Sequence, residues 1–179
     1  MRIVVDLQGA QTSVSRTRGI GRYSVGFAKA LARDAGSHEV WLALNDLFLE
    51  TIEPLRAEFD DLVPQERLIV WQAPAAVAEN APSNRGRREL GERVREAFLA
   101  GLAPDIVHIS SLFEGFVDDA LTSVGVFDQS LPTAATLYDL IPLLYREHYL
   151  VDLLKEAWYE RKLTHLRRAD LCLAISESS

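Results

Sequence analysis

A glycine- and arginine-rich segment, residues 16–23 (RTRGIGRY), could bind an anion. It follows the apolar run 3–7, which is typical of a buried strand, and it leads into a helical pattern that begins at Gly21. Glycines let the backbone approach a ligand, a helix start offers unpaired N–H groups, and arginines donate charged hydrogen bonds. The alternative is a glycine turn with solvated arginines. The segment is not a dinucleotide fingerprint, in which the glycines follow the strand directly.

A carboxylate beyond another expected strand, Asp139, could act on a hydroxyl group. We expect that strand from Pro132 to about Leu137, so Asp139 lies just past its carboxyl end. Ligands of parallel sheets bind at this edge, where a carboxylate can orient or deprotonate an attacking hydroxyl. The alternative is that Asp139 only caps the following turn, which is a common use of aspartate.

A second polar group follows the strand expected over residues 106–109. Its loop carries Ser110, Ser111 and Glu114, which could line an acceptor site. His108 could join them, or it could be a core histidine, since it lies between Val107 and Ile109. The histidines, carboxylates and single thiol show no ligand spacing, and we expect no metal site.

The elements that must position these residues alternate between strand and helix. Because the strands are apolar on both faces, helices must cover both sides. The expected class is α/β, with a Rossmann-like, doubly wound, mainly parallel sheet in one domain over residues 1–179. The expected strands are 3–7, 40–44, 67–71, 106–109, 132–137 and 171–175; the expected helices begin near residues 21, 46, 87 and 149, with a weak helix after the 110–115 loop.

Composition narrows the class of function. The 179 residues carry a net charge of -7, which argues against nucleic acid as the main partner. The single cysteine, Cys172, allows no intrachain disulfide, is expected in the core, and suits a reducing cytoplasm. Five arginines between residues 85 and 95 are interleaved with glutamates, which predicts a solvated face more than a membrane-docking one. The helix near residue 149 should bury a stripe that comprises Leu150, Leu153, Leu154, Ala157 and Trp158.

Three short motifs, residues 16–24, 136–142 and 174–179, together resemble the large retaining "group 1" glycosyltransferases of GT-B fold. The likeness is nearest to bacterial members that build surface polysaccharides, many of them mannosyltransferases. Many members have His-Asp where this sequence has Tyr138-Asp139. A phenol with a pKa near ~10 cannot replace imidazole as a base at neutral pH. Asp139 therefore becomes the candidate for the catalytic or orienting role.

The resemblance implies transfer of a sugar from a nucleoside-diphosphate sugar to a glycan or lipid-linked acceptor hydroxyl. Configuration would be retained and neither metal nor cofactor would be needed. The chain would be the acceptor-side, N-terminal domain, inactive without a C-terminal donor-binding domain that lies outside it. The enzyme would be cytoplasmic, with peripheral contact at the inner face of the membrane a further possibility. The resemblance assigns the donor diphosphate to Gly19, Ile20, Gly21 and Arg22, and the acceptor side to His108, Ser110, Ser111, Glu114 and Tyr138.

Two other functions remain open on the sequence. A GT-B nucleotide-sugar 2-epimerase would have a Gly-Thr-Arg-Pro-Glu-like turn directly after the first strand, and that turn is missing here. The other alternative is a non-catalytic Rossmann-like binding or scaffolding domain, which we would expect to be complete at 179 residues.

Overall fold

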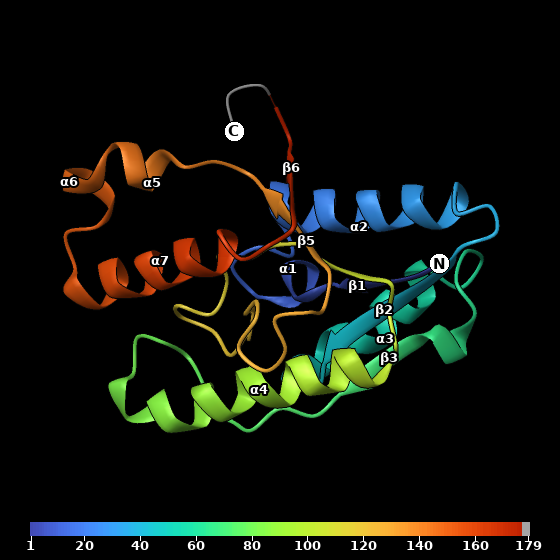
Figure 1. The fold of residues 1–179 in the computed structure, drawn as a ribbon, viewed down its shortest axis with the longest axis horizontal. Coiled ribbons are helices and arrows are strands. Elements are labelled where there is room, and N and C mark those ends of the chain that lie inside the picture. Colours follow the sequence, from blue (N-terminus) through green and yellow to red (C-terminus); the bar gives the residue numbers. More distant parts are fainter. Residues whose placement is uncertain (177–179) are drawn as a thin grey trace.

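The computed structural model describes residues 1–176, and a six-stranded sheet lies at its centre (Figure 1). The strand order is β3-β2-β1-β4-β5-β6, and each neighbouring pair is parallel. The order changes direction between β1 and β4, which in such sheets opens a crevice at the carboxyl ends. The strands are β1 Arg2–Asp6, β2 Glu39–Asn45, β3 Leu68–Trp71, β4 Ile106–Ile109, β5 Thr133–Leu137 and β6 Leu171–Ala174.

Helices cover both faces of this sheet, which confirms the predicted Rossmann-like α/β class and is consistent with one half of a GT-B fold. In Figure 1, α2 and α4 run on opposite sides of the strands. The helices are α1 Gln8–Gln11, α2 Gly19–Arg33, α3 Leu49–Glu58, α4 Arg85–Gly101, α5 Ile141–Leu144, α6 Arg146–Tyr149 and α7 Leu153–Leu166; three short 3-10 turns, η1 Asp46–Phe48, η2 Gln65–Arg67 and η3 Pro82–Asn84, complete them.

The core is divided between the two faces because successive side chains of a strand point to opposite sides. On one face Val5 and Leu42 pack with Ala28 of α2 and Leu55 of α3. On the other face Val4, Ala43, Trp71 and Val107 pack with Leu99 of α4. A smaller cluster joins Leu150 to the buried side of α7 through Trp158, Tyr159 and Leu163.

The segment between β4 and β5 differs from the prediction. Within residues 110–132, all of which the structure describes, no helix forms, so the expected weak helix is wrong. The segment is instead anchored by buried polar contacts. Gln8 bonds to both backbone groups of Leu121, and the ammonium group of Lys162 donates to Thr122 O at 2.8 Å. These contacts satisfy backbone groups that a helix would otherwise satisfy internally.

Charged residues on α4 also differ from the prediction of a solvated face. Arg88 and Arg95 are buried, as are Glu92 and Glu96. Arg88 pairs with Glu79 at 2.9 Å. Half of the acidic and basic residues of this helix are therefore buried in the interior, and they do not form a basic docking surface.

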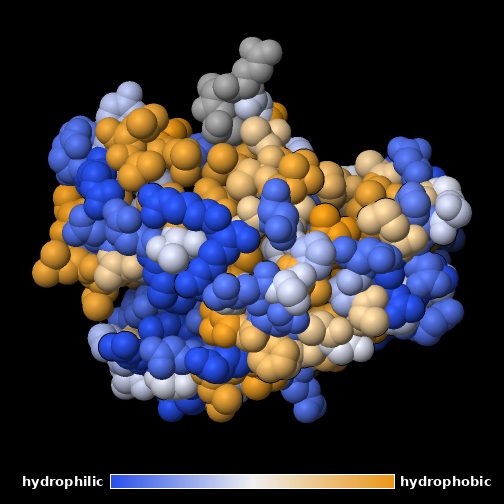
Figure 2. All heavy atoms as spheres, viewed as in Figure 1, coloured by the Kyte–Doolittle hydropathy of each residue, from blue (hydrophilic) through white to orange (hydrophobic). Residues whose placement is uncertain are grey.

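The start of α7 and the last strand expose apolar side chains that the periodicity placed inside. Asp152 caps α7 by accepting from Lys155 N at 2.8 Å, so the helix begins at Leu153, which is 81% exposed. Figure 2 shows apolar residues gathered over α5 and α6. Cys172 on β6 is exposed as well, so its expected core position is wrong. The exposed apolar side chains of this region are Ile141, Leu144, Tyr145, Tyr149, Val151, Leu153 and Leu154.

Among residues 1–176 no helix has both the length and the apolar character to cross a membrane. The same residues contain no group of three or more His, Cys, Asp or Glu side chains placed to hold a metal ion.

Candidate active site

The carboxyl end of β1 carries a buried polar network that the sequence did not suggest. The Arg95 Nε donates to Asp6 Oδ2 at 2.6 Å, and both side chains are almost fully buried. Gln8 donates to the same carboxylate at 3.0 Å and accepts from Asn45 Nδ2 at 2.9 Å. The network joins the ends of β1 and β2 to α4. It thereby fixes the strand ends from which the loop before α2 continues.

Glu114 holds the loop between α1 and α2. Its carboxylate accepts from Ser15 Oγ at 2.6 Å, Ser111 Oγ at 2.9 Å and Thr12 Oγ1 at 3.1 Å. The side chain is 4% exposed, and burial raises its pKa, an effect that the three hydroxyl bonds oppose. The structure thus brings Ser111 and Glu114 together, but turned inward. Both support the glycine-arginine segment from beneath.

Tyr138 joins the two motifs that the sequence singled out. Its hydroxyl lies 3.1 Å from Ser110 O, 3.3 Å from Ile20 O and 3.2 Å from Ser24 Oγ. Its ring meets that of Tyr23 edge to face at 5.6 Å. Burial raises the pKa of the phenol to about 12, so it stays protonated, and its single O–H is shared between the carbonyl oxygens of Ser110 and Ile20. The end of β5 is therefore fastened to the first turn of α2.

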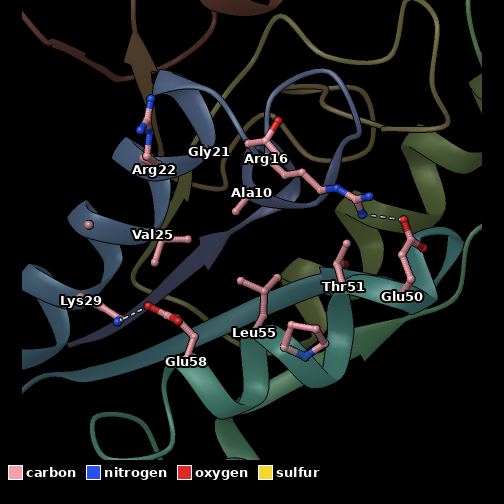
Figure 3. A pocket seen from close by; sticks show the side chains of 13 residues that line it. Ala10, Arg16, Gly21, Arg22, Val25, Lys29, Glu50, Thr51, Leu55 and Glu58 are labelled. Carbon is pink, nitrogen blue, oxygen red and sulfur yellow. Dashed lines mark hydrogen bonds and ion pairs between the residues drawn. The ribbon is translucent and has the colours of Figure 1, made fainter.

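The predicted phosphate residues form that first turn. Gly21 is needed by the protein itself, because a Cβ there would lie 2.5 Å from Arg16 Cα and 2.6 Å from Ser15 O. Its amide donates to Ser15 O at 3.0 Å. By contrast, a Cβ on Gly19 would meet no other described atom within 4 Å. Arg22 is exposed, and in Figure 3 its side chain extends away from α3.

Asp139 follows Tyr138 at the same edge of the sheet. Its side chain is exposed, and Oδ1 accepts from Ile141 N at 3.0 Å. The turn cap that the sequence offered as the alternative is therefore present. It occupies one carboxylate oxygen, and an exposed carboxylate at this edge can still meet a ligand. Its negative charge also contributes to raising the pKa of Tyr159, after burial as the main cause.

His108 lies apart from these groups. It is 3% exposed, its ring centroid is 4.5 Å from that of Phe27 on α2, and Nε2 pairs with Thr136 Oγ1 at 2.9 Å. Burial lowers its pKa to about 4, so the ring is neutral near pH 7. Ser110 is buried too, beneath Gly9, where a Cβ would come within 3.2 Å of Ser110 Oγ. The side chains of both residues therefore lie inside the domain and not at its surface.

A pocket of about 750 Å³ opens beside this edge, between α2 and α3 (Figure 3). Arg16, Gly21 and Arg22 line one end of it. The pocket was not predicted, because its two walls come from helices that only the fold brings together.

Of the third motif, residues 174–176 lie at the end of β6, and residues 177–179 lie outside the described part of the chain.

Comparison with known proteins supports a relationship to glycosyltransferases. No family model matches the chain. The chain is 35% identical over 180 aligned residues to an Escherichia coli protein described as "Serotype-specific mannosyltransferase WbdA", and the match covers 100% of this chain and 21% of that protein. Two further Escherichia coli proteins with the same description are 34% and 33% identical over 153 residues, which cover 85% of the chain and 19% of each protein. The chain thus spans about a fifth of the length of the curated relatives that it matches, and along its whole length it resembles one segment of these mannosyltransferases.

Proposed function

We propose that this chain is the acceptor-side domain of a retaining, GT-B, group 1 glycosyltransferase that acts in surface polysaccharide synthesis. The enzyme transfers a sugar, mannose by analogy with the relatives, from a nucleoside-diphosphate sugar to an acceptor hydroxyl. The observation that carries the proposal is the contact between Tyr138 and Ile20, because it places both predicted motifs at one strand edge. The similarity to mannosyltransferases along the whole chain supports the same class of reaction.

The donor diphosphate meets the first turn of α2 in this proposal. The turn combines the positive end of a helix with the exposed side chain of Arg22. Open space around Gly19 lets a phosphate approach the backbone. Gly21 has a different task, since its missing side chain lets the Ser15–Arg16 backbone pack against the helix.

The acceptor hydroxyl meets Asp139. The carboxylate lies at the carboxyl end of β5, next to the residue that is bonded to α2. There it can orient the hydroxyl by a hydrogen bond or take its proton as transfer proceeds. Tyr138 does not exchange protons in this scheme, because its pKa of about 12 keeps it protonated, and it positions Asp139 relative to the donor loop.

A second domain supplies the rest of the donor site. The relatives are about five times longer than the matched segment, which leaves room for such a domain. The exposed apolar residues Leu171 and Ile175 at the edge strand support a partner surface there, since unpaired edges are normally covered. The burial of Arg88 and Arg95 leaves little support for membrane contact through α4.

Donor binding by the protein at its full encoded length tests the proposal. Arg22→Ala should weaken binding of a nucleoside-diphosphate mannose by on the order of 1.5–3 kcal/mol, the value of a charged hydrogen bond. Arg33→Ala, an exposed arginine at the other end of α2, is the matched control and should bind like wild type. If both variants bind the donor equally well, the first turn of α2 is not part of the donor site. The anomeric configuration of the product, read by NMR, separates retention from inversion.

A further inference from the structure

The pocket between α2 and α3 has a construction that the proposed transfer step does not use. Figure 3 shows an ion pair at each end, Arg16 with Glu50 at 2.8 Å and Lys29 with Glu58. Between them lies a floor of aliphatic groups, formed by Ala10, Val25, Pro54 and Leu55. The pocket therefore has an apolar middle and charged, paired ends.

A glycine keeps one wall of the pocket open. Gly26 lies in the middle of α2 and lines the pocket. A Cβ at this position would meet no other atom of the described residues within 4 Å, so the backbone does not require glycine here. A glycine inside a helix costs about 0.5–1 kcal/mol relative to alanine. The helix thus loses stability at a position where a side chain would narrow the pocket.

The lining favours a neutral, polyhydroxylated ligand. Arg16 pairs with Glu50 and Lys29 pairs with Glu58, so these four side chains carry no net charge and favour neither an anion nor a cation. Hydroxyl groups both donate and accept, so they can bond to either member of each ion pair. The C–H faces of sugar rings can pack on Val25 and Leu55. The volume of about 750 Å³ falls within the range of about 300–1,000 Å³ that ligand pockets occupy, and it exceeds what one sugar ring needs.

We propose that this pocket binds the acceptor oligosaccharide behind its reacting end. Gly21 and Arg22 line the pocket and also belong to the first turn of α2, so a glycan held here can continue from the pocket to the strand edge that carries Asp139. The inference rests on the proposed glycosyltransferase function and deepens it, because it names where the acceptor chain is held. The pocket adjoins the proposed place of the donor diphosphate, because Gly21 and Arg22 lie where the two meet.

NMR titration of the ¹⁵N-labelled chain with an α-linked mannotriose tests this directly. We expect shifts at Val25, Gly26 and Leu55 that saturate with sugar. Gly26→Trp should fill the pocket and abolish these shifts, and a melt would verify that the variant is folded. Gly86→Trp is the control, because Gly86 is also an exposed helical glycine whose Cβ would meet no described atom within 4 Å. It should bind like wild type.

Three outcomes would overturn the inference. The first is that mannotriose causes no shifts, and the second is that it shifts only residues at the strand ends. The third is that inorganic phosphate causes the same saturable shifts around Gly26, which would show that the pocket is an anion site. In the protein at full encoded length, Gly26→Trp should raise the acceptor KM at least tenfold and leave donor binding unchanged. Normal acceptor KM with intact mannose transfer would refute the pocket alone, whereas absence of any sugar transfer by wild type would refute the proposed function.

Discussion

At the scale of single residues, two side chains hold together the loop and the strand end that form the candidate site. Glu114 receives three hydroxyl groups under the glycine-arginine loop, and Tyr138 ties β5 to α2. Asp139 is the exposed carboxylate at this edge. A catalytic role and a capping role for Asp139 are compatible in this structure, because the cap uses one of its two oxygens.

Substitution of Asp139 should separate these roles. In the protein at full encoded length, Asp139→Asn should lower kcat by about 10²- to 10⁴-fold, the usual contribution of a general base. The melting temperature should change little, since the asparagine oxygen can still accept from Ile141 N. Tyr138→Phe should instead cost about 0.5–1.5 kcal/mol of stability for its lost hydrogen bond and affect kcat less. A wild-type kcat in Asp139→Asn would show that Asp139 only caps the turn and has no catalytic role.

Buried His108 should make stability depend on pH. Its pKa in the folded chain is about 4, below the ordinary value of 6.5, because burial disfavours the charged ring. The unfolded chain therefore binds this proton first as pH falls, and stability that is present above pH 6.5 is lost toward pH 4.

Chemical denaturation of His108→Gln across this range measures the effect. Relative to this variant, wild type should lose up to about 1.4 kcal/mol per pH unit between pH 6.5 and 4. Exposed His148→Gln serves as the control and should follow the wild-type profile. Parallel profiles of stability against pH for wild type and His108→Gln would show that His108 has the same pKa in the folded and the unfolded chain.

At the scale of elements, two of the three glycines of α2, Gly21 and Gly26, have opposite effects. Gly21→Ala places a Cβ against the Ser15–Arg16 backbone, which must shift, and we expect a loss of about 1–3 kcal/mol. Gly26→Ala meets open space among the described residues and should add about 0.5–1 kcal/mol. Urea unfolding of the two variants measures both values. Equal effects of the two substitutions would contradict the close packing seen at Gly21.

Two arginines of α4 give a second matched pair. Arg95→Met removes the partner of buried Asp6 and should cost about 3–5 kcal/mol, because the carboxylate is left uncompensated. Arg85→Met breaks an exposed pair with Glu89 on the same helix and should cost less than about 1 kcal/mol. Thermal or urea unfolding would detect the difference. A small loss in Arg95→Met would indicate that Asp6 is neutralised in another way.

The elements were predictable where periodicity is local. The bounds of the six strands and of the helices α2, α3, α4 and α7 were all expected to within a few residues. Short apolar runs and amphipathic stripes can be read from neighbouring residues alone. The pair of Asp6 and Arg95 was not predictable, since it joins residues 89 positions apart. It also buries charged side chains, which normally lie at the protein surface. Leu153 and Leu154 were expected in the core, but they are exposed, because the first turn of α7 extends beyond the core.

At the scale of the whole molecule, the sheet is packed on both faces and has two edge strands, β3 and β6. The clusters on both faces predict that the 179 residues fold alone, with a cooperative thermal melt. The isolated chain should nevertheless have no transferase activity, because one wall cannot exclude water from the donor or complete its phosphate site. A donor-hydrolysis assay on the folded chain checks this. Turnover at rates typical of enzymes would mean that these residues contain a complete active site.

The most direct test of the proposed function is sugar transfer by the protein at its full encoded length. Radiolabelled nucleoside-diphosphate mannose is supplied with a mannose-terminated acceptor, and label in the extended glycan is counted over time. We predict label in the product, with retained configuration at the new linkage. Absence of transfer from nucleoside-diphosphate mannose and from other nucleoside-diphosphate sugars, by folded protein that carries this domain, would contradict it.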